Sequence, residues 1–262
     1  MNKNVRLFQE RSMNLYNNLF TGNIHSIETF GTFDGPGVRY VLFLQGCPFQ
    51  CQYCHNRDTW STEENKRMTV EEVLHDFERY SHFYKNGGIT VSGGEALLQI
   101  GFITELFKKA KERNIHTCLD TSAGCYNEKQ IDLYKTLLSY TDLVLLDIKH
   151  IDDDEHMKLT KSSNKHVLKF ASLLSELKVD TVIRHVLIPT INDQDIYLNQ
   201  LRTFLDRLNN VKKIEVLPYH KKGIAKWEAM GLTYELKHIE EPTQEMIKKA
   251  EFILTNNYHF IK

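Results

Sequence analysis

The sequence predicts an α/β fold in the form of a partial (β/α)6 barrel that is open on one side. Six short apolar runs, rich in β-branched residues, have the length and composition of strands. Helical patterns lie between and after them, and strand–helix units in series predict a parallel sheet covered by helices. A complete barrel of this type needs eight units in about 250 residues. Only six are visible here, so we expect the barrel to be incomplete.

The predicted elements alternate along the chain from residue 39 onward. The strands are Arg39–Leu44, Gly88–Val91, His116–Asp120, Leu143–Ile148, Thr181–Ile188 and Lys213–Leu217. The helices are Val70–Phe83, Leu97–Arg113, Lys129–Leu138, Lys165–Leu177, Ile196–Leu208 and Thr243–Tyr258. Thr69, followed by Glu71 and Glu72, is typical of a helix start. Thr243 with Glu245 is a second start of this kind.

Other segments lie outside these units. The segment Ile24–Phe33 is expected to form an extra strand at the edge of the sheet. The acidic run Asp152–Glu155 is expected to begin a helix, where its carboxylates complement the helix dipole. Residues 1–22 are polar and mixed in charge, and we interpret them as an extension of unknown role with a loose helix over Leu7–Leu19. Residues 23–262 show no linker and are expected to form one domain.

Charge and hydropathy narrow the class of protein. The chain has 33 basic and 34 acidic residues, a formal net charge of -1, whereas a general nucleic-acid binder usually has a basic excess. No apolar run approaches the roughly 20 residues needed to cross a bilayer, and the N-terminal segment lacks the apolar stretch of a secretory signal. We therefore expect a cytoplasmic protein with reduced thiols that binds neither nucleic acid nor membrane.

Three of the five cysteines form a compact motif. Cys47, Cys51 and Cys54 follow the first predicted strand at C-x3-C-x2-C spacing. Thiolates are the ligands of iron–sulfur clusters, and one loop that carries three of them can wrap one cluster. Because a cubane has four irons, three thiolates leave one iron open, as a catalytic metal centre requires. Cys118 lies inside a predicted strand and is more typical of a buried structural thiol.

Three other interpretations of these cysteines are open. Cys51, Cys54 and His55 match the C-x-x-C-H pattern of c-type haem attachment, although this leaves Cys47 unused and favours an exported protein. The cysteines and His55 could hold structural zinc, but such sites more often pair two separated C-x2-C units, and His55 directly follows Cys54. A thioredoxin-like dithiol would have no use for the third cysteine.

Polar residues gather where the predicted strands end. They are Cys47 after the first strand, Ser92–Glu95 after the second, Asp120 and Thr121 after the third, Asp147 and Lys149 at the fourth, and His220 after the sixth. Sites in parallel α/β folds form at the carboxyl ends of the strands. One shared site explains these five positions better than core packing does.

These motifs, in this order, resemble a known superfamily. The cysteine motif, with an aromatic residue at Tyr53, resembles the signature of the radical S-adenosylmethionine superfamily, and Ser92-Gly93-Gly94-Glu95 resembles its GGE motif. The segments Asp34–Arg39 and Tyr53–Trp60 are similar to the activating enzymes of glycyl radical enzymes. Three further segments look most like the activators of pyruvate formate-lyase: His116–Thr121, Leu145–Lys149 and Leu217–His220.

The resemblance runs from about Ile24 to the C-terminus and implies a single cluster. Many other activators insert a cysteine-containing segment between the cysteine motif and GGE. Here only 37 residues separate Cys54 from Ser92, and none is a cysteine. The resemblance therefore implies an oxidoreductase with one 4Fe–4S cluster on Cys47, Cys51 and Cys54.

The resemblance also implies the reaction. S-adenosylmethionine would bind the open iron, and its reductive cleavage would yield a 5′-deoxyadenosyl radical that takes a hydrogen from a glycine of pyruvate formate-lyase. A flavodoxin or ferredoxin would donate the electron. Activation of a different glycyl radical enzyme, or chemistry on a small molecule, are the alternatives.

Individual residues receive roles from the same resemblance. Contacts to S-adenosylmethionine are expected from Tyr53, Cys54, His55, Gly93, Gly94, Glu95, Asp120, Asp147, Ile148, Lys149 and His220. A monovalent cation is expected among Asp120, Thr121, the Leu145 carbonyl and Asp147, because two inward-facing carboxylates need a counter-charge. Asp34 is expected to face the glycine loop of the partner, and Arg184 has no assigned role. Plainer alternatives are a turn role for the glycines, a helix N-terminal acid for Glu95 and a surface position for Lys149.

Overall fold

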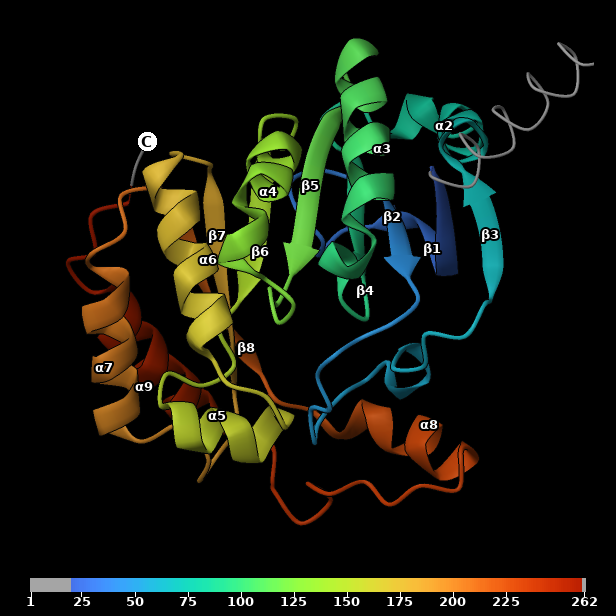
Figure 1. Ribbon diagram of the computed structural model, residues 1–262. Helices are drawn as coiled ribbons and strands as arrows, with labels where there is room; N and C mark the ends of the chain where they lie inside the picture. The colour runs from blue at the N-terminus through green and yellow to red at the C-terminus, as the bar shows by residue number, and fades with distance from the viewer. Residues whose placement is uncertain (1–19, 261–262) are drawn as a thin grey trace, which may run out of the picture.

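The computed structural model describes residues 20–260, which form one mixed sheet with helices packed against it (Figure 1). The eight strands lie in the order β3-β1-β2-β4-β5-β6-β7-β8. They are β1 (Thr21–Gly31), β2 (Arg39–Leu44), β3 (Lys66–Thr69), β4 (Gly88–Gly93), β5 (His116–Thr121), β6 (Leu143–Asp147), β7 (Thr181–Leu187) and β8 (Val211–Pro218). The helix predicted over Leu7–Leu19 lies outside the described residues.

The six predicted strands form the parallel part of this sheet. From β2 through β4, β5, β6 and β7 to β8, each strand pairs with the next in parallel register. The strand order ends at β3 on one side and at β8 on the other, so the sheet as described does not close on itself. The predicted open, partial barrel is confirmed.

The extra strand near the N-terminus exists, but its predicted place at the edge of the sheet is wrong. β1 pairs antiparallel with β2 on one side and with β3 on the other. The edge strand is therefore β3, which has only four residues. Its exposed Lys66 and Arg67 hide it from a search for apolar runs, although such charges are typical of edge strands.

Helices cover the sheet and border its carboxyl edge. They are α2 (Val70–Glu78), α3 (Ile100–Glu112), α4 (Ile131–Leu138), α5 (Asp153–Thr160), α6 (Lys165–Glu176), α7 (Asp195–Leu205), α8 (Ile224–Ala229) and α9 (Gln244–Thr255). All six predicted helices are present, and short 3-10 turns such as Ala96–Gln99 occupy some of the predicted ends. The sequence does not predict α8, because six residues are too few to show a helical period. Within residues 20–260, no helix combines the length and the apolar character that crossing a bilayer would require.

Two helix starts follow the chemistry expected of them. At α2, Thr69 accepts from the Glu72 N–H at 3.2 Å, while the Glu72 carboxylate accepts from the Thr69 N–H at 2.7 Å, which forms a capping box. At α5, the Asp152 carboxylate accepts from the Glu155 N–H at 3.0 Å. The prediction that the acidic run begins a helix is therefore confirmed.

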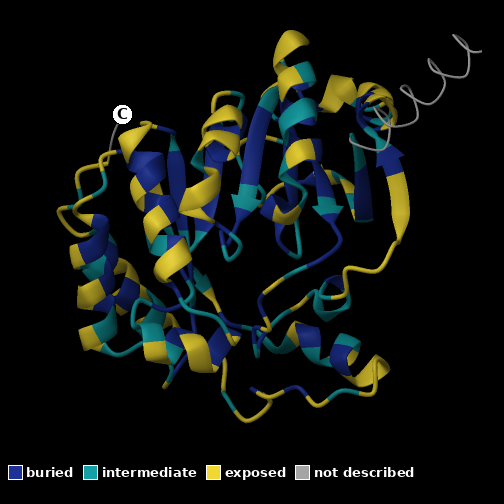
Figure 2. Cartoon of the chain, viewed as in Figure 1, coloured by how far each residue is buried: buried dark blue, intermediate teal, exposed yellow. Residues whose placement is uncertain are grey.

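The core lies between the sheet and the helices. Figure 2 shows strands that are mostly buried and helices that expose their outer faces. Helix α3, for example, buries Ile103, Leu106 and Phe107. The arrowheads of β2 and β5 in Figure 1 point toward the side on which α5 and α8 lie. Since the parallel strands share one direction, their carboxyl ends meet at this edge, and the side chains that follow them are brought together.

Candidate active site

A cavity of about 400 Å³ lies at the carboxyl ends of the parallel strands. Most residues singled out from the sequence line it: Asp34, Cys47, Cys51, Tyr53, Cys54, His55, Gly93, Gly94, Asp120, Thr121, Asp147, Lys149 and His220. Arg184 lines it as well. Glu95, Leu145 and Ile148 are not among the residues that line it. The fold has thus gathered into one place residues that are far apart in the sequence.

The cysteine loop is anchored to a helix that is distant in sequence. The N–H groups of Gln50 and Gln52 donate to the carbonyls of Thr160 and Leu159 at the end of α5, at 2.8 and 3.0 Å. These two amides flank Cys51 on either side. The position of the central cysteine therefore depends on α5, and the sequence gives no sign of this contact.

Cys51 is buried, and Cys47 and Cys54 are partly buried beside it. Burial raises the pKa of Cys51 to about 12, although the Lys149 ammonium partly offsets the rise. Burial also raises the pKa of Cys47, and the charges of Glu95 and Cys51 add to it. Metal binding displaces thiol protons and compensates the charge of the thiolates, so a bound cluster would offset the cost of ionising Cys47 and Cys51. Within residues 20–260, no three His, Cys, Asp or Glu side chains are arranged to hold a single ion, whereas a cubane offers separate irons to three thiolates.

Gly93 and Gly94 let the end of β4 pack against the cysteine loop. Gly93 has a φ of +131°, and a Cβ there would lie 2.2 Å from the Leu44 nitrogen. A Cβ at Gly94 would lie 2.3 Å from the Gly46 carbonyl oxygen, to which the Glu95 N–H also donates. The lack of a side chain at these two glycines thus allows other backbone segments of the protein to approach closely. Both glycines line the cavity, and their contact with S-adenosylmethionine stays a prediction.

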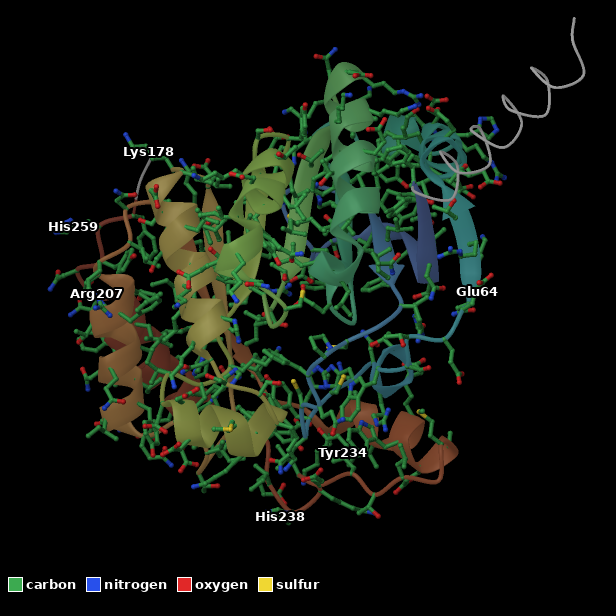
Figure 3. The ribbon with its side chains drawn as sticks, viewed as in Figure 1. Glu64, Lys178, Arg207, Tyr234, His238 and His259 are labelled. Atoms are coloured by element: carbon green, nitrogen blue, oxygen red, sulfur yellow. The ribbon has the colours of Figure 1, made fainter. Side chains whose placement is uncertain are left out.

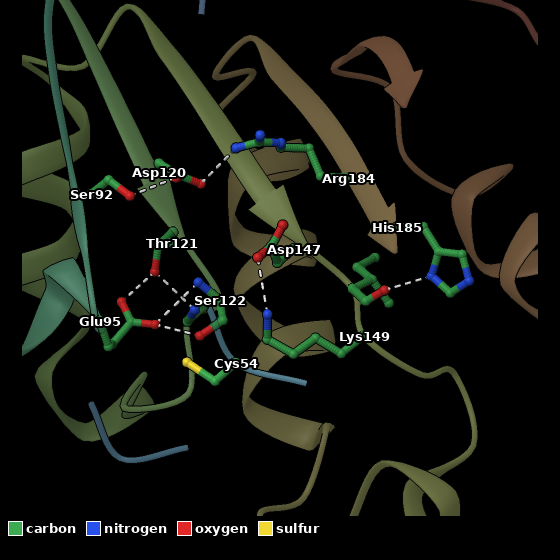
Figure 4. Close-up of polar contacts among 12 residues, drawn as sticks. Cys54, Ser92, Glu95, Asp120, Thr121, Ser122, Asp147, Lys149, Arg184 and His185 are labelled. Atoms are coloured by element: carbon green, nitrogen blue, oxygen red, sulfur yellow. Dashed lines mark hydrogen bonds and ion pairs between the residues drawn. The ribbon is translucent and has the colours of Figure 1, made fainter. Parts of the chain in front are cut away.

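Glu95 is nearly fully buried, and its carboxylate is occupied by neighbouring groups (Figure 4). Oε1 accepts from the Thr121 hydroxyl and from the Leu97 N–H. Oε2 accepts from the N–H and the hydroxyl of Ser122, at 3.1 and 2.7 Å. Glu95 thereby ties the segment after β4 to the segment after β5. Its expected contact with the ammonium of S-adenosylmethionine remains a prediction.

Two acidic side chains in the lining of the cavity each pair with a basic one (Figure 4). Asp120 accepts from the Ser92 hydroxyl at 2.7 Å and pairs with Arg184 Nη1 at 3.3 Å. Asp147 pairs with Lys149 Nζ at 3.0 Å. All four charged side chains are at most 28% exposed. Arg184, which had no role from the sequence, is therefore the counter-charge of Asp120.

The pKa values of the two acids shift in opposite directions, because burial dominates at Asp120 and the nearby cations dominate at Asp147. Burial raises the pKa of Asp120 to about 6, with Arg184 opposing the rise and Asp147 adding to it. Burial would also raise the pKa of Asp147, but Lys149 and Arg184 outweigh it and hold that pKa below its usual value. The pKa of Lys149 stays well above its usual value, because Asp147 outweighs the effect of burial. Lys149 is therefore a permanent cation on the cavity wall.

The backbone around Lys149 is fixed by side chains that sequence reasoning missed. The carbonyls of residues 148–151 each accept from a buried side chain of another element. The donors are His185 to Ile148 at 2.7 Å, Asn192 to Lys149 at 3.1 Å, and Asn164 to His150 and Ile151 at 3.2 and 2.6 Å. A sequence offers no signal for such bonds, because the donors are ordinary polar residues distant from the segment that they hold.

Aromatic and imidazole groups also line the cavity. The rings of His55 and His220 stack with their centroids 4.0 Å apart. Tyr53 is 7% exposed, and its ring lies 5.8 Å from Lys149 Nζ. Tyr53 Oη, His220 Nδ1 and Arg184 Nε are buried without a hydrogen-bond partner among the described residues. Unused polar atoms beside a stack of flat rings fit a polar ligand with an aromatic base, such as S-adenosylmethionine.

Asp34 reaches the cavity on a loop held by buried groups. The Thr90 hydroxyl donates to the Asp34 carbonyl at 2.6 Å, and Arg39 Nη1 donates to the Pro36 carbonyl at 3.1 Å. Burial raises the pKa of the Asp34 carboxyl, and the charge of Arg184 opposes the rise. Asp34 thus faces the cavity, whereas its contact with a partner stays a prediction.

Comparison with known proteins agrees with this geometry. The model of the radical SAM superfamily matches residues 41–198. A pyruvate formate-lyase-activating enzyme of Staphylococcus epidermidis is 48% identical over 237 residues, which cover 88% of this chain and 94% of the relative. The Staphylococcus aureus protein of the same name is 47% identical over the same shares.

Solved structures show the same fold at lower identity. A domain of a pyruvate-formate lyase-activating enzyme from Bacteroides vulgatus aligns with a TM-score of 0.55 and 24% identity, over 65% of this chain and 94% of that one. Streptococcus suis SuiB, bound to its precursor peptide SuiA, aligns with a TM-score of 0.61 and 15% identity, over 99% of this chain and 53% of that one.

The chain belongs to the radical SAM superfamily and, within it, to the family of these staphylococcal activating enzymes. The superfamily implies a 4Fe–4S cluster and S-adenosylmethionine, in place of the haem, zinc or dithiol interpretations. The residues fit these groups, because three thiols line one cavity together with polar atoms that have no hydrogen-bond partner and the Lys149 cation.

Proposed function

We propose that this chain activates pyruvate formate-lyase by generating a radical on one of its glycines. The main observation behind this proposal is the cavity. Three thiols, Lys149 and the stacked histidines line it, and the sheet beside it is not closed into a barrel. The 48% identity to a relative with that name supports the choice of substrate. An open side suits a substrate that is a loop of another protein.

The residues of the chain have distinct parts in this proposal. Cys47, Cys51 and Cys54 would hold the cluster and leave one iron free. When bound, the cluster and S-adenosylmethionine supply one-electron cleavage of a sulfur–carbon bond, which makes hydrogen abstraction from glycine possible. Lys149 would pair with the carboxylate of S-adenosylmethionine as a charge-assisted contact. The hydrogen bonds that hold the backbone around Lys149 would keep its side chain in position for this contact.

Other residues that line the cavity would orient the nucleoside part. His55 and His220 offer a stacked pair of rings, and Tyr53 offers a hydroxyl without a partner. Asp120 and Asp147 would accept from hydroxyl groups. Asp34 would face the glycine loop, since it stands on the loop before β2 and lines the same cavity.

A monovalent cation and an electron donor complete the proposal. The cation would bind among Asp120, Thr121, the Leu145 carbonyl and Asp147. Lys149 and Arg184 already supply counter-charge to the two carboxylates, so the cation would have to compete with them. A flavodoxin or ferredoxin would deliver the electron, and the setting would be the cytoplasm.

The test is direct. Reduced, reconstituted protein is mixed without oxygen with S-adenosylmethionine and pyruvate formate-lyase, and electron paramagnetic resonance is recorded. A glycyl radical doublet on pyruvate formate-lyase is expected, and a lyase whose reactive glycine is replaced by alanine should give none. A competent assay that shows cleavage of S-adenosylmethionine but no doublet would reject pyruvate formate-lyase as the substrate.

A further inference from the structure

Two indole N–H groups converge on Cys54. Trp60 Nε1 donates to Cys54 Sγ at 3.3 Å, and Trp227 Nε1 donates to the Cys54 carbonyl oxygen at 2.8 Å. Trp60 follows the cysteine motif, whereas Trp227 lies on α8, so the fold alone brings them to the same residue. Both the sulfur and the backbone of this one cysteine are thereby held.

Trp60 is fixed in this position by its neighbours. The Arg57 guanidinium lies 3.8 Å from the centre of the Trp60 ring. The rings of Trp60 and Trp227 meet edge to face at 5.7 Å, and Trp227 meets Tyr234 in the same way at 5.5 Å. Tyr234 lies in the segment after α8 that closes this side of the molecule (Figure 3). The indole that donates to the sulfur is therefore a built feature of the site.

The other two thiols have different donors. The pKa of Cys47 is raised mainly by burial, and the backbone amide of Phe49 opposes the rise through a hydrogen bond. The backbone amide of Cys51 does the same for its own thiol. Cys54 thus differs in receiving an N–H from a side chain, which a substitution can remove without altering the backbone.

We propose that Trp60 is a positioning residue that raises the reduction potential of the cluster through its hydrogen bond to Cys54 Sγ. When the cluster takes up one electron, negative charge on its ligand sulfurs increases. A donor on a ligand sulfur stabilises that charge more in the reduced state than in the oxidised state. No bond breaks in this step, and the indole keeps its proton. The proposal rests on the cluster that the superfamily implies, and not on the identity of the protein substrate.

The experiment is a redox titration of the reconstituted full-length protein, without S-adenosylmethionine or any partner. Trp60→Phe keeps an aromatic ring under Arg57 and loses the N–H. Iron and sulfide contents are expected to match the original protein, while the midpoint potential shifts to a more negative value. The signal of the reduced cluster in electron paramagnetic resonance serves as the readout.

Trp227→Phe is the matched control. It removes the indole N–H that donates to the Cys54 carbonyl, but it leaves the hydrogen bond from Trp60 to Cys54 Sγ in place. Its shift should be clearly smaller than that of Trp60→Phe. An unchanged potential in a fully loaded Trp60→Phe protein, or equal shifts in both variants, would overturn the proposal. If Trp60→Phe does not retain its cluster, benzothienylalanine at position 60 keeps the ring shape without the N–H, and the same two outcomes decide.

Discussion

The imidazole of His185 on β7 donates from Nδ1 to the carbonyl oxygen of Ile148, 2.7 Å away (Figure 4). A carbonyl only accepts hydrogen bonds, so the proton of the neutral ring must be on Nδ1. Ile148 stands between Asp147 and Lys149. A buried neutral histidine thus fixes the backbone between the two charged side chains that pair on the cavity wall.

This contact predicts that stability falls in mild acid. Burial lowers the pKa of His185 to about 4, and it lowers the pKa of His156 to about 4 as well. In the unfolded chain each ring protonates near its ordinary value of about 6.5. Each histidine therefore stabilises the fold fully above that pH, and this stability is lost as the pH falls from about 6.5 to about 4. The loss is about 1.4 kcal/mol per pH unit for each residue.

The check is urea unfolding between pH 7 and pH 4.5 for the original protein and for His185→Asn. The asparagine amide can still donate to Ile148 but does not titrate, so the dependence of unfolding free energy on pH should become shallower. His238→Asn, at an exposed position, should leave the slope unchanged. Equal slopes in all three proteins would show that folding does not lower the pKa of His185, which would contradict this prediction.

Lys149→Ala is expected to weaken binding of S-adenosylmethionine while the cluster remains. A charged hydrogen bond of this kind is worth about 1.5–3 kcal/mol, which corresponds to a roughly 10- to 100-fold rise in Kd. The measurement is anaerobic calorimetry on protein whose iron content has been determined. Lys248→Ala, on the exposed side of α9, serves as the control. An unchanged Kd would remove Lys149 from the binding site.

Gly94→Ala is expected to prevent proper placement of the cysteine loop. The new Cβ would lie 2.3 Å from the Gly46 carbonyl oxygen and 2.9 Å from the Cys47 Cβ. Neither atom can move without displacing Cys47, the first of the three proposed ligands, so iron incorporation should fall sharply. A Cβ at Gly101 on α3 meets nothing within 4 Å. Gly101→Ala should therefore keep its iron and gain about 0.5–1 kcal/mol in unfolding free energy.

Cys51→Ala should abolish cluster binding and leave the fold largely intact. Two thiolates cannot hold a cubane in the way that three do, and the alanine fits the space of the buried thiol. Iron and sulfide analysis after anaerobic reconstitution should give almost none, against about four of each in the original. Cys125→Ala, outside the motif, should load normally. Four irons in Cys51→Ala would refute the ligand assignment.

The parallel strands and the ends on which the site stands could be predicted from the sequence. The strands β2 and β6 are buried on both faces, so their stretches Tyr40–Leu44 and Leu143–Leu146 are continuously apolar and easy to recognise. Helix α3 could be predicted as well, because its apolar residues recur with the period of a helix and form a stripe that faces the core. The edge strand β3 and helix α8 were not predicted, because elements of four and six residues are too short to show a recognisable pattern.

The sequence by itself indicated which side chains gather at the candidate site. The spacing of Cys47, Cys51 and Cys54 is local, and the order of polar residues at strand ends follows from a parallel sheet. The tertiary structure alone decided how these groups are held. The pairing of Asp120 with Arg184 and the bond from His185 to Ile148 join residues more than 30 positions apart. Such contacts depend on the order of the strands in the sheet and on the direction of side chains at their ends, which no local sequence pattern encodes.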